Sequence, residues 1–153
     1  MLLDLRYLFE KLSSEGWSWT VDCVESLLQA LGLIEEPVRD TADTRRLFRA
    51  RSGLRCLLLD GSNGSPAAFE FRFPIPDEVG RQPELLGPFA LITAATVSHV
   101  FGPAEVRLTG AASGDDLYLQ GLRWQHPRAL ITLSLCKQTD GQAESLALGF
   151  HAA

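Results

Sequence analysis

Histidine and cysteine are the side chains of this sequence best suited to bind a metal or to act as nucleophiles, and both are scarce. The histidines show no H-E-x-x-H spacing and the cysteines form no C-x-x-C pair, so the patterns typical of zinc sites are missing. Three scattered cysteines also disfavour a disulfide framework. Each lies in an apolar pattern that indicates a buried, unreactive thiol, with one reactive thiol as the alternative. These residues are His99, His126, His151, Cys23, Cys56 and Cys136.

Adjacent carboxylates could act as a general acid and base, but here they occur only in polar, turn-like segments: Glu35–Glu36, Asp77–Glu78 and Asp115–Asp116. General acid–base chemistry needs a carboxylate held in a low-dielectric pocket. Glu70 comes closest because phenylalanines flank it, yet strand alternation turns it to the opposite face. The glycines of residues 61–65 lack the lysine and helix of a phosphate loop. We therefore expect no catalytic residue, no metal and no cofactor.

The bulk composition is that of one globular domain. The chain has 153 residues, of which 46% are hydrophobic and 22% charged, enough for a sizeable core. Its apolar runs are far too short for a membrane span. The opening MLLDLRYLFEKL carries an acid where a signal peptide would be basic. We expect a single domain over residues 1–153, located in the cytoplasm.

The net charge of -5 is concentrated in the N-terminal part of the chain. Residues 1–43 hold nine acidic and three basic side chains. This imbalance disfavours nucleic acid as a ligand and favours a basic partner, with a solvated helical surface as the alternative. The candidate partner-binding residues are Asp22, Glu25, Glu35, Glu36, Asp40 and Asp43.

A basic cluster, RRLFRARSGLR, follows at residues 45–55. It could contact nucleic acid or an acidic partner. Its alternation with apolar residues is instead typical of the polar face of a β-hairpin. The acidity of the remaining chain argues against the nucleic-acid alternative.

Apolar spacing and end signals predict three helices, over residues 2–13, 22–31 and 88–101. Asp22 is the expected N-cap of the second helix and Gly32 its C-terminal stop. The apolar residues expected to line one side of each helix are Leu2, Leu5, Leu8, Phe9 and Leu12, then Val24, Leu27, Leu28 and Leu31, then Phe89, Ile92, Thr96 and Val100.

Seven strands are expected between turn signals, at residues 45–50, 54–60, 67–75, 104–110, 116–125, 129–136 and 145–151. Residues 34–44 are expected to form a polar connector. In the third strand Phe69, Phe71 and Phe73 share one face by strict alternation. The order of elements predicts an α+β domain. In it, an antiparallel sheet of about six to seven strands is covered by two N-terminal helices and one central helix.

Trp17 and Trp19 stand two positions apart just before the second helix, in a chain with three tryptophans. In an extended segment the two rings share one side. We interpret them, together with Trp124, as structural aromatics; for the pair, we expect packing over the sheet that fixes how the N-terminal helices dock. A partner-binding hot spot and a ligand-stacking pair are the alternatives.

Four short motifs occur in order along the chain: Trp17-x-Trp19, Ala30-Leu31-Gly32, Phe101-Gly102-Pro103 and Arg123-Trp124. Their arrangement resembles that in small actinobacterial proteins of unassigned function, encoded near secreted polymorphic toxins. The resemblance implies an immunity-like protein that binds and neutralises a partner toxin, and it carries over no catalytic residue.

An inhibitor needs a complementary surface rather than reactive groups, and acidic side chains could steer it to a basic toxin. We therefore expect an inhibitor that occludes the active or substrate-binding surface of a cognate secreted toxin domain. One alternative is a secretion chaperone or adaptor that dimerises through an apolar helix or strand face. Another is a small-molecule-binding domain with a tryptophan-lined cleft.

Overall fold

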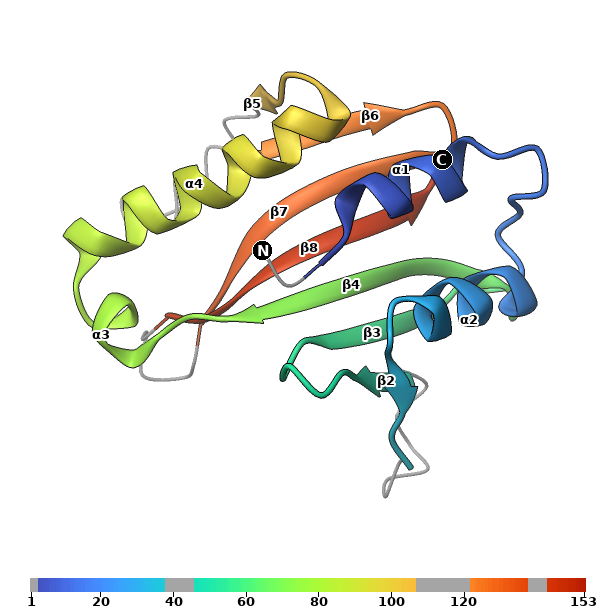
Figure 1. Cartoon of the computed structure of the whole chain (residues 1–153), viewed down its shortest axis with the longest axis horizontal. Coiled ribbons are helices and arrows are strands. Elements are labelled where there is room, and N and C mark those ends of the chain that lie inside the picture. The colour runs from blue at the N-terminus through green and yellow to red at the C-terminus, as the bar shows by residue number, and fades with distance from the viewer. Residues whose placement is uncertain (1–2, 38–45, 107–121, 138–142) are drawn as a thin grey trace.

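An antiparallel sheet is the framework of the molecule (Figure 1). The computed structural model describes residues 3–37, 46–106, 122–137 and 143–153. Eight strands lie in the order β1-β2-β3-β4-β8-β7-β6-β5. Their bounds are Ile34–Glu35 (β1), Arg46–Arg49 (β2), Arg55–Asp60 (β3), Pro66–Pro74 (β4), Glu105–Val106 (β5), Leu122–His126 (β6), Ala129–Lys137 (β7) and Ala143–Ala152 (β8). The predicted α+β class is confirmed.

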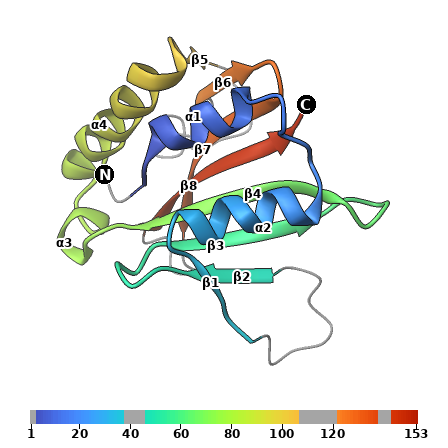
Figure 2. The ribbon, with the colours of Figure 1, turned by 45° about the vertical axis from the view of Figure 1, so that its right-hand side comes forward.

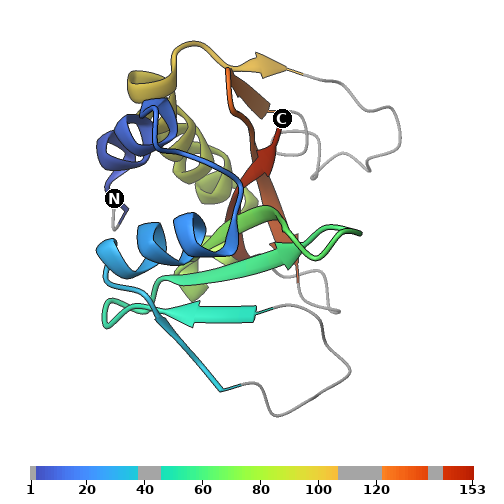
Figure 3. The same ribbon diagram turned by 90° about the vertical axis from the view of Figure 1, so that its right-hand side faces the viewer.

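The helices gather on one face of this sheet, as Figures 2 and 3 show. They are α1 (Leu5–Ser13), α2 (Val21–Ala30), α3 (Asp77–Gly80) and α4 (Pro83–Phe101). In the views, α2 lies over β3 and β4, whereas α1 lies over β7 and β8. The short α3 was not predicted, and it directly precedes α4.

Where the residues are described, the strand predictions hold with one difference at the edge of the sheet. Ile34–Glu35, expected to belong to a polar connector, instead pair with β2 as the edge strand β1. The rest of that connector from residue 38 lies outside the described residues. Much of the two strands predicted at 104–110 and 116–125 also lies outside them.

The first helix begins later than predicted because Asp4 caps it. The Asp4 side chain accepts a hydrogen bond of 3.0 Å from the backbone N–H of Tyr7. Leu5, Leu8 and Leu12 are buried as expected, whereas Phe9 is 39% exposed. Leu2 lies outside the described residues.

The N-cap of α2 is Thr20, not Asp22. The Thr20 hydroxyl accepts from the backbone N–H of Cys23, so the helix starts at Val21. Asp22 still lies in the first turn, where a negative charge favours the helix dipole. Gly32, with φ of +84°, lies beyond its C-terminal end as predicted.

The central helix begins at Pro83, and the predicted start at Pro88 was wrong. Pro83 takes the first-turn position that suits proline, and Pro88 lies inside the helix. The expected stripe was wrong in part: Phe89 and Val100 pack against the core, whereas Ile92 is 69% exposed and Thr96 is exposed as well. The buried positions are Ala90, Ala94 and Val97, whose small side chains let the helix pack closely.

The core lies between the helices and the sheet. The three phenylalanines of β4 all face it, as their alternation predicted. Phe69 lies opposite Phe150 of β8, and the two rings stack with centroids 5.1 Å apart. The buried apolar face continues across the neighbouring strands through Leu148, Leu146, Ile131, Leu133 and Trp124.

Candidate functional site

The two N-terminal tryptophans lie against the sheet at the connection between α1 and α2. Their rings meet edge to face with centroids 5.6 Å apart. Both also contact Phe69 of β4, with centroid distances of 6.4 Å from Trp17 and 5.5 Å from Trp19. The indole N–H of Trp19 donates a 2.8 Å hydrogen bond to the carbonyl oxygen of Arg128. Such contacts are those expected when Trp17 and Trp19 pack the α1–α2 connection against the sheet.

Residues of the turn between β6 and β7 also form hydrogen bonds with the C-terminal end of α1. The Arg128 side chain donates to the carbonyl oxygen of Ser14, just beyond the helix. His126 Nδ1 accepts from the Arg128 backbone N–H at 3.1 Å, so the ring proton is placed on Nε2. Nε2 lies 3.0 Å from the Ser13 hydroxyl and donates to it. Burial, with the Arg128 charge as a second cause, lowers the pKa of His126.

Trp124 is the most deeply buried of the three tryptophans, at 1% exposed. Its indole N–H donates a 3.0 Å hydrogen bond to the hydroxyl of Ser98 in α4. This contact joins the central helix to β6 and satisfies the buried polar atom of the ring.

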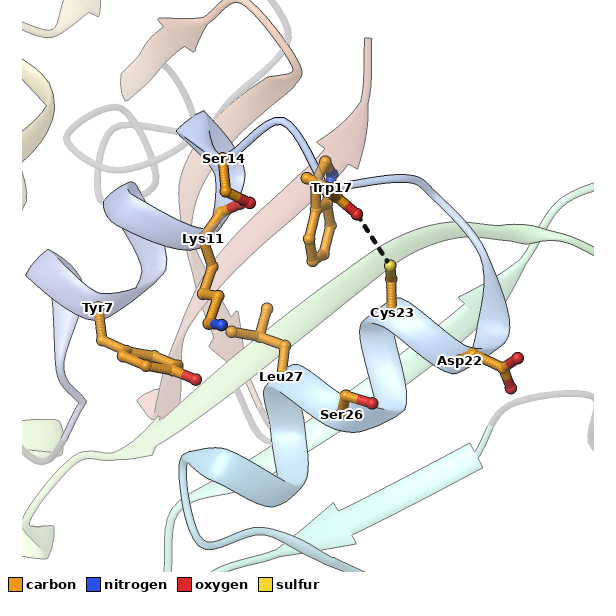
Figure 4. Close-up of a pocket in the computed structure, with 9 residues that line it drawn as sticks. Tyr7, Lys11, Ser14, Trp17, Asp22, Cys23, Ser26 and Leu27 are labelled. Carbon is orange, nitrogen blue, oxygen red and sulfur yellow. Dashed lines mark hydrogen bonds between the residues drawn. The ribbon is translucent and has the colours of Figure 1, made fainter.

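A groove of about 420 Å³ opens between α1 and α2 (Figure 4). The close-up shows Tyr7 and Lys11 projecting from α1 and Cys23 from α2, with Trp17 at one end. The Lys11 ammonium lies 5.5 Å from the centre of the Tyr7 ring, where the two attract. Trp17 lines this groove, so the groove is the candidate site for the small-molecule alternative.

The two cysteines with described side chains differ in reactivity. Cys23 is not a core residue as predicted, because it is only partly buried at the groove. Hydrogen bonding from the Ser18 hydroxyl lowers the pKa of its thiol. Cys56 is fully buried, and burial raises the pKa of its thiol. The side chain of Cys136 lies outside the described residues.

The groove does not assemble a catalytic pair. The thiol of Cys23 donates to the carbonyl oxygen of Gly16 at 3.5 Å, a contact drawn in Figure 4. Among the residues that line the groove no histidine lies beside this thiol to act as its base. His99 is exposed on α4, and His151 of β8 bonds to the Thr132 hydroxyl at 3.0 Å. Within the described residues, no cluster of three or more histidine, cysteine or acidic side chains could hold a metal.

Most of the described candidate partner-binding acids are engaged in ion pairs. Arg46 of β2 binds Glu35 through two nitrogens, at 2.8 and 2.6 Å, and also contacts Glu25 of α2. These contacts raise the pKa of Arg46 and lower that of Glu35. Glu36 pairs with Arg49 at 2.6 Å.

The other three acids of that set are placed differently. Asp22 is exposed in the first turn of α2, and Asp40 and Asp43 lie outside the described residues. The ion pairs leave less free negative charge on this surface than the sequence alone implies.

The outer face of α4 was not anticipated as a candidate site. Leu91 and Ile92 are 64% and 69% exposed, and Leu85 is 42% exposed. The signal was present in the sequence, because residues 85–98 contain no charged side chain. A helix with only one buried side normally carries charges on the other.

In the described part of the chain, no helix is long and apolar enough to span a membrane. Comparisons with protein-family models, with curated proteins and with solved structures find no match to this chain.

Proposed function

We propose that this protein is an immunity-like inhibitor. It binds a cognate secreted toxin domain in the bacterial cytoplasm and occludes the active or substrate-binding surface of that toxin, with no catalysis or cofactor of its own. The outer face of α4 is the observation that carries the proposal. The four motifs that resemble toxin-linked proteins supply the class of partner.

The outer face of α4 has the properties of a protein-binding surface. Single exposed apolar side chains are ordinary, but Leu91 and Ile92 adjoin each other on a stretch without charges. Pro88 and Ala95 are exposed on the same helix and extend this apolar surface. Water contact with such a surface is unfavourable, so covering it with a partner supplies binding energy.

The helix is also held rigidly, which an occluding inhibitor requires. Ala90, Ala94 and Val97 are buried against the core, and Ser98 is hydrogen-bonded to Trp124. A surface that is already ordered loses little conformational entropy when a partner binds. Occlusion therefore needs no rearrangement of α4.

The chaperone or adaptor alternative would use the same face of α4 between two copies of this chain. The small-molecule alternative would use the groove beside Trp17 instead. Each alternative can be distinguished from the inhibitor without a toxin. A chaperone of that kind is a dimer in solution, and binding of a small molecule in the groove changes the fluorescence of the tryptophan there.

Co-expression with a toxin domain encoded by a neighbouring gene tests the proposal, with a matched pair of variants. Ile92→Asp and Ile34→Asp make the same chemical change at sites of similar exposure, 69% and 73%. We expect Ile92→Asp to lower the affinity for the toxin by about thirtyfold or more, the effect of losing an interface hot spot. Ile34→Asp should bind and protect cells as the wild type does.

Failure of the toxin to bind, together with failure to rescue cells that express it, would exclude the inhibitor function. A stable dimer in light scattering that Ile92→Asp dissociates would support the chaperone instead.

A further inference from the structure

Three arginines of neighbouring strands form a row in the sheet register. The helices lie on one face of this sheet and leave the other uncovered (Figure 3). Arg49 of β2 lies directly opposite Arg55 of β3, and Arg55 lies directly opposite Arg72 of β4. Their sequence neighbours Phe48, Cys56 and Phe71 are buried on the helix side. Because side chains alternate along a strand, the arginine row points away from the core.

Such a row is electrostatically unfavourable in the isolated protein. Like charges directly opposite each other in neighbouring strands repel, and here two such pairs share Arg55. Glu36 pairs with Arg49, and Glu70 lies 3.2 Å from Arg72. Within the described residues Arg55 has no carboxylate partner.

The row also contains an unsatisfied donor. Arg72 Nε is buried, and its 3.2 Å contact with Glu70 Oε1 does not have hydrogen-bond geometry. No other acceptor reaches it within the described part of the chain. Among the described residues two carboxylates, Glu36 and Glu70, pair with a row of three guanidinium groups, so the row keeps an excess of positive charge.

The residues around the row indicate what kind of ligand it suits. Leu47, Leu57 and Leu59 lie on the same face of β2 and β3 and are only partly buried. Arginine mixed with apolar side chains is typical of protein interfaces. The aromatic rings that could stack with nucleic-acid bases, such as Trp19 and Phe69, lie on the helix side. The net charge of -5 also opposes nucleic acid.

We propose that this arginine row binds an acidic segment of a partner protein, with Arg55 as its central contact. Guanidinium groups bind carboxylates through two parallel hydrogen bonds, which suits a glutamate- or aspartate-rich peptide. The partly exposed leucines contact the methylene groups of the acidic side chains. This surface lies on the opposite side of the sheet from α4, so it is separate from the proposed inhibitory face.

Fluorescence anisotropy with a defined probe tests this site. The probe is a labelled peptide of about eight residues with alternating glutamate and alanine, which places the acids on one side when extended. The same peptide with glutamine in place of glutamate is the neutral control, and an oligothymidylate is the nucleic-acid control. We expect the acidic peptide alone to bind, and added salt to weaken its binding.

Matched variants assign the binding to the arginine row. Arg55→Glu should lower the affinity for the acidic peptide by about tenfold or more. Arg6→Glu makes the same charge change at an exposed position of α1 and should have little effect. Arg55→Gln, which only removes the charge, should also weaken binding while leaving the unfolding temperature unchanged or raised. Ile92→Asp should not affect it, so this site and the α4 face can fail independently.

Three results would overturn the assignment. One is equal binding of the acidic and glutamine peptides. Another is an equal loss of affinity in Arg55→Glu and Arg6→Glu. The third is tighter binding of the oligothymidylate than of the acidic peptide, which would identify the row as a nucleic-acid surface.

Discussion

The indole of Trp19 donates a hydrogen bond to the carbonyl oxygen of Arg128, across 109 positions of the chain. This contact joins the α1–α2 connection to the turn between β6 and β7. The neighbouring Trp17 packs against the same Phe69 ring, but its indole nitrogen is buried without an acceptor among the described residues. Two tryptophans that look equivalent in the sequence thus differ in hydrogen bonding: the indole nitrogen of Trp19 has an acceptor, and that of Trp17 has none among the described residues.

Changing each tryptophan to phenylalanine should separate these roles. Both changes remove a similar ring volume, but Trp19→Phe also removes the hydrogen bond to Arg128. We expect Trp19→Phe to be less stable than Trp17→Phe by about 1–2 kcal/mol in urea unfolding. Equal losses would show that the hydrogen bond contributes nothing. Loss of partner binding in a fully stable Trp17→Phe would instead support the hot-spot alternative.

The contact between Trp124 and Ser98 should matter more than an exposed hydroxyl on the same helix. Ser98→Ala leaves the buried indole N–H without an acceptor and should cost about 1–3 kcal/mol. Thr96→Ala is the control, since the Thr96 hydroxyl is exposed and bonds only to its own helix. Thermal unfolding of the two variants measures the difference, and equal midpoints would contradict the prediction.

Protonation of His126 should destabilise the protein. Its pKa in the folded state lies below the ordinary value of 6.5, so the unfolded chain binds the proton more readily. The stabilising contribution is therefore complete above pH about 6.5 and is lost as the pH falls through the folded pKa. His126→Gln should remove this part of the pH dependence, whereas His99→Gln, at an exposed position, should retain it. Unfolding in urea at several pH values between neutral and mildly acidic provides the measurement.

Cys23 should react with iodoacetamide in the native protein, whereas Cys56 should react only on unfolding. Cys23 is partly exposed, and the lowered pKa of its thiol increases the reactive thiolate. Ser18→Ala removes the hydroxyl donor and should shift the pH midpoint of Cys23 alkylation upward. Mass spectrometry of the labelled peptides distinguishes the two sites. Native labelling of Cys56 ahead of Cys23 would contradict the burial described for them.

The bridge made by Arg46 should stabilise the position of α2 over the sheet. Arg46→Gln should cost about 1 kcal/mol, because Arg46 holds carboxylates of both α2 and β1. Arg123→Gln is the control, since Arg123 pairs with Glu105 of the adjacent strand and should cost less. The lowered pKa of Glu35 adds a pH test. Its contribution is present above the ordinary value of 4.5 and is lost as the pH falls further, so wild type and Arg46→Gln should converge in acid. A constant difference at all pH values would exclude this ion pair as the cause.

Local patterns predicted much of the fold. The alternation of Phe69 and Phe71 identified the buried face of β4, and Gly32 marked the end of α2, because these signals act within a few residues. The error in the N-cap of α2 arose because two nearby residues compete for that position. Thr20 and Asp22 can both cap a helix, and their spacing alone does not decide between them.

Tertiary packing explains the error in α4. The prediction placed Ile92 toward the core together with Phe89 and Val100, whereas Ile92 is exposed and the smaller Ala90 and Ala94 are buried. When a helix is apolar on all sides, the volume available in the core decides which side is buried. The spacing of apolar residues along the sequence does not reveal that volume. The uncovered side became the candidate binding face.

The sequence by itself determined the α+β class, the antiparallel strands and the apolar residues of β4, since alternation and turn residues are local properties. Only the tertiary structure decided which charges meet. Arg46 and Arg49 are close in sequence, yet β-strand alternation directs one toward Glu25 of α2 and the other to the uncovered face. Strand register then placed Arg49, Arg55 and Arg72 side by side. Register depends on pairing between distant segments, so a charge count along the chain could not show it.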